Sequence, residues 1–168
     1  INKFYSDINA RYSKFSKFDG KKPEFIVADT FDEIVDKSKN KVLRLIEEEK
    51  FNGRDIAILS DLSMKPANYN SKNSLKLNLE ENDLEVISAR EYAMPYIKEG
   101  YENKITFDSI KRFKGLEKPI IILVNLENNL DNEDKMRDIY SGLSRARGHL
   151  IIVSNQQSIN YLKELYSN

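Results

Sequence analysis

Short apolar runs alternate with amphipathic stretches along most of the chain. Apolar runs of strand length occur at 24–28, 55–60, 84–87, 104–110, 119–125 and 150–153. The run at 119–125 is the most continuously apolar, which is typical of a strand that is buried on both faces of a parallel sheet. The pattern therefore predicts an α/β sheet with helices on both faces.

Helical spacing fills the intervals between the predicted strands. Thr30-Phe31-Asp32-Glu33 has the form of a capping box and predicts a helix to about residue 50, ended by Asn52-Gly53. A short helix is predicted near 75–79, another from Glu133, and a closing helix around 159–165. Residues 1–18 carry an aromatic stripe, which favours a helix packed on a core, with base stacking as the alternative. The segment 61–74 is predicted to be a loop, and 88–102 is ambiguous.

Composition limits the function classes. The 168 residues suit one domain, spanning 1–168, and Lys plus Arg equal Asp plus Glu at 27 each. Zero net charge argues against nucleic-acid binding by bulk charge, although a local basic strip is still compatible with it. The absence of Cys excludes disulfides, and a single His argues against a zinc site, so no metal ligand is predicted.

The ends of the chain and its hydropathy bear on location. No apolar run approaches the roughly 20 residues that span a bilayer, and no signal peptide is visible. We therefore expect a cytoplasmic protein with no membrane partner. The chain begins at Ile1 and not at Met, so we expect a fragment of a longer protein.

The first segment with chemical character is 109–117, which reads Ser-Ile-Lys-Arg-Phe-Lys-Gly-Leu-Glu. It lies between two predicted strands and contains a glycine that a ligand can approach closely. Ligands of open α/β sheets gather at the carboxyl ends of strands, which is where this segment begins. Spacing alone favours a basic surface turn closed by Gly115.

The second segment is 139–147, which reads Ile-Tyr-Ser-Gly-Leu-Ser-Arg-Ala-Arg and precedes the last predicted strand. If it is helical, Ser141 and Arg145 share a face, and Arg147 points about 200° away from Arg145. Two arginines at a helix end complement the helix dipole. Their planar guanidinium groups also suit phosphate.

Taken together and in this order, the two segments resemble motifs V and VI of UvrD-like superfamily 1 helicases. Lys114-Gly115-Leu116-Glu117 before an apolar strand is similar to motif V. Residues 140–147 are similar to motif VI, usually Tyr-Val-Ala-Leu-Thr-Arg-Ala-Arg. The resemblance covers about 22–157. It implies the second, C-terminal RecA-like domain of such a helicase, a three-layer αβα unit of the P-loop NTPase superfamily with a mostly parallel sheet.

The resemblance implies roles at a nucleotide. Arg145 matches the arginine finger, which reaches the γ-phosphate held by the other RecA-like domain, a role consistent with stabilising charge on a transferring phosphoryl group. Glu117 matches the carboxylate that contacts the nucleotide ribose, and Gly115 the glycine beside the nucleotide. ATP with Mg²⁺ is thus the implied cofactor.

The resemblance also implies contacts with single-stranded DNA, or with RNA. Ser109 falls where the family usually has Thr, and Lys111 where it usually has His. A hydroxyl and an ammonium can both contact phosphate. Arg112 is a further candidate and Lys114 a weaker one. The replacement of His by Lys111 leaves the detailed strand contacts open.

A phosphate-binding loop, G-x-x-x-x-G-K-[ST], occurs nowhere in the sequence. We therefore expect this chain to be inactive alone and to meet ATP held mainly by an N-terminal RecA-like domain, its expected partner. The leading hypothesis is an ATP-dependent DNA helicase or translocase. The alternative is a nucleic-acid-sensing or regulatory ATPase half-domain that does not unwind DNA.

Overall fold

A computed structural model describes residues 21–60, 75–93, 103–124, 126 and 133–167. The helix predicted at 1–18 and the loop predicted at 61–74 lie outside the described residues. In chain order the elements are β1 (Glu24–Val27), α2 (Phe31–Glu47), η1 (Gly53–Asp55), β2 (Ile56–Ser60), α4 (Leu75–Glu80), β3 (Val86–Ile87), α5 (Ala89–Tyr92), β4 (Ile105–Ser109), β5 (Lys118–Val124), α6 (Glu133–Leu143), β6 (Ala146–Ser154) and α7 (Gln156–Ser167).

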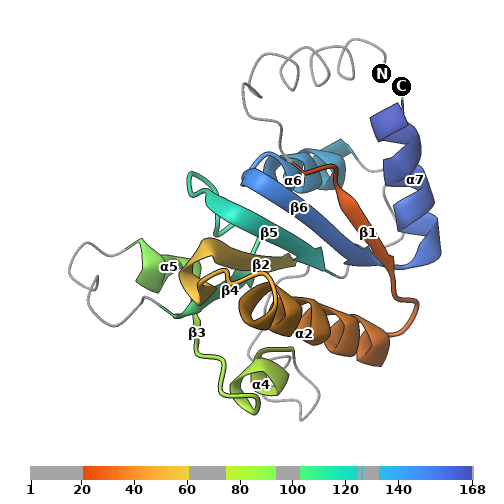
Figure 1. The fold of residues 1–168 in the computed structure, drawn as a ribbon. Coiled ribbons are helices and arrows are strands. Elements are labelled where there is room, and N and C mark those ends of the chain that lie inside the picture. Colours follow the sequence, from red (N-terminus) through yellow and green to blue (C-terminus); the bar gives the residue numbers. More distant parts are fainter. Residues whose placement is uncertain (1–20, 61–74, 94–102, 125, 127–132, 168) are drawn as a thin grey trace.

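The described strands form one six-stranded sheet in the order β1-β6-β5-β2-β4-β3, and every neighbouring pair is parallel (Figure 1). β5 and β2 are central, and their residues are almost all buried. The continuous apolar run therefore marks a strand covered on both faces, as the sequence predicts. The α/β fold with a mostly parallel sheet is confirmed.

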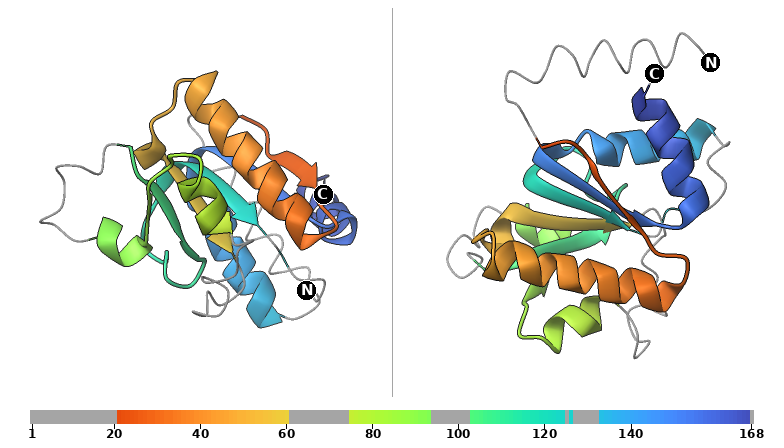
Figure 2. Two further views of the ribbon diagram at one scale, coloured as in Figure 1. Left: turned by 90° about the horizontal axis from the view of Figure 1, so that it is seen from below. Right: turned by 45° about the vertical axis from the view of Figure 1, so that its right-hand side comes forward.

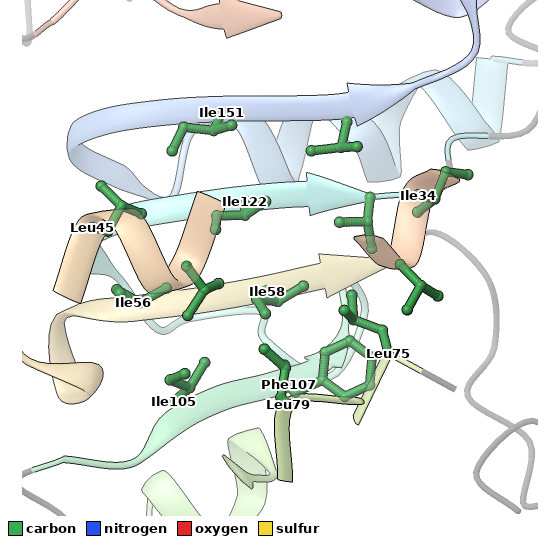
Figure 3. Packing of buried hydrophobic residues seen from close by; sticks show 14 of the residues in the cluster. Ile34, Leu45, Ile56, Ile58, Leu75, Leu79, Ile105, Phe107, Ile122 and Ile151 are labelled. Atoms are coloured by element: carbon green, nitrogen blue, oxygen red, sulfur yellow. The ribbon is translucent and has the colours of Figure 1, made fainter. Parts of the chain in front are cut away.

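Helices cover both faces of the sheet. α2 and α4 lie on one face, and α6 and α7 lie on the other (Figure 2). On the first face, Ile34 and Leu45 of α2 and Leu79 of α4 pack on Ile58 and its neighbours in the sheet (Figure 3). Alternate residues of each strand serve the two faces, which gives three layers.

The local signals of α2 are confirmed. The Thr30 hydroxyl accepts the Glu33 amide (3.2 Å), and Glu33 accepts the Asp29 amide (2.9 Å). α2 ends at Glu47, earlier than predicted. Gly53 instead begins η1, where an added Cβ would collide with the Asn103 carbonyl.

Strand boundaries needed several corrections. β3 has only two residues, and the ambiguous segment contains the one-turn helix α5, which Ser88 caps. β6 begins at Ala146, four residues before the predicted strand, because Ala146 already pairs with Lys118 of β5. Among the described residues, no helix is both long and apolar enough to cross a membrane.

Candidate nucleotide and nucleic-acid sites

The segment 110–117 crosses the sheet. It leaves the carboxyl end of β4 and reaches the amino end of β5, and β2 lies between these two strands. Ile110 and Phe113 are buried against β2 and α6, and the Ile110 amide donates to the Ser60 carbonyl (2.9 Å). The segment thus begins at the carboxyl end of a strand, as expected. Because β4 and β5 run in the same direction, its far end lies at the amino ends of the strands.

The carboxyl-end region contains Ser109, Lys111 and Arg112 and is built on a buried carboxylate. Asp108 is fully buried, and its oxygens accept the Ala89 amide (3.0 Å) and the Ser109 amide (2.8 Å). The Ser109 hydroxyl accepts the Arg112 amide (3.3 Å), which closes the following turn. Asp108 thus joins α5, β4 and the turn, and it fixes the backbone that presents the basic side chains.

Both basic candidates of this region have acidic neighbours. Lys111 Nζ lies 3.1 Å from Asp138 Oδ2 on α6, and Arg112 Nη1 lies 3.7 Å from Asp108 Oδ1. The Lys111 and Arg112 side chains are exposed. They are therefore accessible to a phosphate, but each already has a counter-charge.

Gly115 lies near the other end of the segment 110–117, three residues before β5 begins. Its φ is +89°, a conformation that side chains disfavour, and no described residue other than its two chain neighbours has an atom within 4 Å of the position that a Cβ would take. The site is open, so a ligand can approach this backbone closely. The role that the resemblance implies for this glycine stays a prediction.

Arg145 lies in the turn between α6 and β6. Its amide donates to the Gly142 carbonyl (3.1 Å), its Nε to the Ser141 carbonyl (3.1 Å) and its Nη2 to the Ser141 hydroxyl (3.4 Å). Within the described part of the chain, the two side-chain bonds use two of the five N–H donors of the guanidinium, which leaves three donors for an anion. The half-buried side chain is thus oriented by α6 without being fully occupied.

Arg147 corrects the helical expectation for 139–147. α6 ends at Leu143, and Arg147 belongs to β6. Helix propensity is a weak preference that strand pairing with β5 overrides here. Arg147 Nε lies 4.0 Å from Glu117 Oε2, and both side chains are exposed.

The two sequence motifs meet at the amino ends of β5 and β6. The Lys118 amide donates to the Arg145 carbonyl (3.2 Å), which places Arg145 beside the residue that follows Glu117. Gly115, Glu117 and Arg145 therefore belong to one amino-end region. Ser109, Lys111 and Arg112 form the separate carboxyl-end region.

Lys118 is a buried amine next to this region. Its side chain is 1% exposed; Nζ donates to the Arg54 carbonyl and lies 3.6 Å from the centre of the Tyr92 ring. Burial lowers the pKa of Lys118 to about 8, and Asp55 opposes that shift. Sequence reasoning missed this residue, although a lysine that starts an apolar strand is a visible signal.

His149 follows the segment that resembles motif VI, and its contacts hold the fold together. It is buried, with Nε2 3.5 Å from Glu24 Oε2, and Lys41 of α2 lies 2.8 Å from the same oxygen. Burial, followed by the charge of Lys21, lowers the pKa of His149. These contacts join β1, β6 and α2 and lie outside both candidate regions.

Asp108 and Asp138 were also missed by sequence reasoning. Asp108 is the charged residue within the apolar strand β4, which is a signal that could have found it. Asp138 carries no such signal, because its contact with Lys111 depends on how α6 packs on the crossing segment.

Comparisons with known proteins support the fold. No protein-family model matches the chain, and no curated protein matches it. Among solved structures, it is similar to the C-terminal domain of a possible DNA helicase from Lactobacillus plantarum WCFS1, with 21% identity, a TM-score of 0.57, and coverage of 81% of this chain and 75% of that chain. It is also similar to the Mss116p DEAD-box helicase domain 2 bound to an RNA duplex, with 13% identity, a TM-score of 0.52 and coverage of 86% of this chain.

The chain spans 59% of the length of that second structure. At these identities the similarity concerns the fold. The chain has the RecA-like fold of helicase C-terminal domains.

Proposed function

We propose that this chain is the C-terminal motor domain of an ATP-dependent DNA helicase or translocase of the UvrD-like superfamily 1. In this proposal Arg145 completes an ATPase site built mainly by an N-terminal RecA-like domain. Ser109, Lys111 and Arg112 contact the backbone of a single strand. The observation that carries the proposal is the junction of the two motif segments, where the Arg145 carbonyl accepts the Lys118 amide.

The residues of the amino-end region fit a nucleotide that approaches from outside the chain. Gly115 is open, Glu117 presents an exposed carboxylate, and Arg145 has guanidinium donors to offer. Bound ATP with Mg²⁺ would supply the phosphoryl group whose hydrolysis drives movement. Arg145 would stabilise negative charge on that group, and Glu117 would orient the ribose through its hydroxyls.

The carboxyl-end region fits an extended strand. Its cations are exposed, and the turn that presents them is fixed through Asp108 and Ser109. Backbone contacts of this kind position a nucleic acid without reading its sequence. Closure of two RecA-like domains on ATP, followed by opening, would shift such a strand.

A second candidate function is a nucleic-acid-sensing ATPase half-domain that does not unwind. The observation that favours it is Lys111, which replaces the histidine typical of the resembled family and is already paired with Asp138. A weaker grip on the strand would suit sensing better than processive movement.

The test uses a protein that contains this chain together with a RecA-like domain carrying a phosphate-binding loop. ATP turnover is measured with and without single-stranded DNA or RNA, and strand displacement is measured on a partial duplex. DNA-stimulated turnover with displacement is expected. Stimulated turnover without displacement would favour the sensing candidate, and turnover indifferent to nucleic acid would overturn both. The isolated chain serves as the control, with no ATP turnover expected.

A further inference from the structure

The contact between Lys111 and Asp138 joins the crossing segment to α6. Their side chains are 76% and 37% exposed, with 3.1 Å between Nζ and Oδ2. Exposed ion pairs of this kind are weak and are screened by salt. The pair is therefore strong enough to place a carboxylate on Lys111, and weak enough for another anion to replace it.

The two carboxylates near the basic turn differ in what else they hold. Asp108 is buried and accepts two backbone amides, so its place is fixed by the fold. Asp138 is on the surface of α6, and Lys111 is the ion-pair partner that the described residues give it. Only Asp138 can leave its cation without exposing a buried charge or unpaired amides.

We propose that the Asp138 carboxylate binds Lys111 where a nucleic-acid phosphate would bind. Asp138 then weakens strand binding because it competes with the phosphate for that lysine. This inference rests on the proposed function, in which Lys111 contacts the strand. A carboxylate and a phosphate diester both present oxygen acceptors with one negative charge to an ammonium. Binding of the strand therefore exchanges one anion for another at Lys111. The gain in binding free energy is smaller than it would be for an unpaired lysine.

The exchange has two measurable consequences. Removal of the Asp138 charge leaves Lys111 available to the phosphate and removes repulsion between the strand and α6. Lys111 then neutralises a phosphate in full, so more counterions leave the strand on binding. For single strands each neutralised phosphate contributes about 0.7 to the slope of log K against log salt.

The test measures binding of the chain to fluorescently labelled oligothymidylate by anisotropy, over a range of salt concentrations. Asp138→Asn is expected to tighten binding about 3- to 10-fold at low salt, the range for loss of one adjacent charge, and to steepen the salt slope by up to about 0.7. Asp134→Asn is the matched control. It removes the same charge one turn earlier on α6, where Asp134 lies 3.4 Å from Arg137, and a change below about twofold is expected.

Lys111→Ala and the double variant Lys111→Ala with Asp138→Asn complete a cycle. If Asp138 acts through Lys111, Asp138→Asn raises the strand affinity much less in the Lys111→Ala background than in the unchanged chain. An equal gain in the absence of Lys111, or an equal gain from Asp134→Asn, would overturn the inference and leave the proposed function intact. Absence of binding by every variant, with circular dichroism showing a folded chain, would overturn both.

Discussion

The two candidate regions lie at opposite ends of the strands, and the chain holds them in different ways. At the carboxyl end of β4, the buried carboxylate of Asp108 accepts two backbone amides and fixes the turn. At the amino ends of β5 and β6, the side chain of Arg145 is held by Ser141 of its own preceding helix, and Glu117 by an exposed contact with Arg147. The difference indicates a more rigid carboxyl-end region and a more adaptable amino-end region.

α6 touches both regions. Asp138 on its surface pairs with Lys111, and Ser141 near its end holds Arg145. The two candidate regions therefore share one supporting helix. Substitutions in each region test whether the two differ in this way.

The largest effect is expected from Arg145→Ala in a protein that contains both RecA-like domains. Loss of an arginine finger lowers ATP turnover by about 10³-fold or more, because charge on the transferring group loses its stabilisation. The loss is measured as the steady-state rate of ATP turnover at saturating ATP. Arg147→Ala is the control, with turnover within a few-fold of the unchanged protein. Similar losses in both variants would show that the two arginines act as one electrostatic patch.

The next effect concerns the stability of the carboxyl-end region. Asp108→Ala leaves the Ala89 and Ser109 amides without their acceptor, which is expected to lower the free energy of unfolding by about 2–4 kcal/mol. Urea unfolding measures the loss. Asp138→Ala removes an exposed carboxylate from the same surroundings and should change stability by less than about 0.5 kcal/mol. Equal losses would mean that the turn does not depend on the buried carboxylate.

The smallest effect is expected at Gly115. Its left-handed backbone makes Gly115→Ala unfavourable by about 1–2 kcal/mol, although the surrounding space is open. Thermal or urea unfolding detects the loss, with the exposed neighbour Lys114→Ala as the control. If Gly115→Ala were as stable as that control, the prediction of a fixed left-handed turn would be wrong. The turn would then be free to change its conformation, and the contrast between the rigid carboxyl-end region and the adaptable amino-end region would be larger.

Sequence alone determined the class of fold, because its signals are local. Alternation of apolar runs with helical spacing predicted a parallel α/β sheet, and the cap at Thr30 and the apolar strand before residue 125 lie where they were predicted. The order of the two motif segments also pointed to a helicase domain, and the fold agrees with that. The roles of Arg145, Glu117 and Lys111 stay predictions.

Tertiary structure decided which candidate residues belong together. In the sequence, Lys111 and Glu117 stand in one short segment. In the fold, that segment runs from the carboxyl end of β4 to the amino end of β5, so its two ends lie at opposite ends of the parallel strands. Arg147 lies in a strand because Ala146 pairs with Lys118, and the hydrogen bond from the Lys118 amide to the Arg145 carbonyl joins the two motif segments. The contact of Asp138 with Lys111 likewise arises from packing between distant segments, because no local pattern encodes which surfaces the fold brings together.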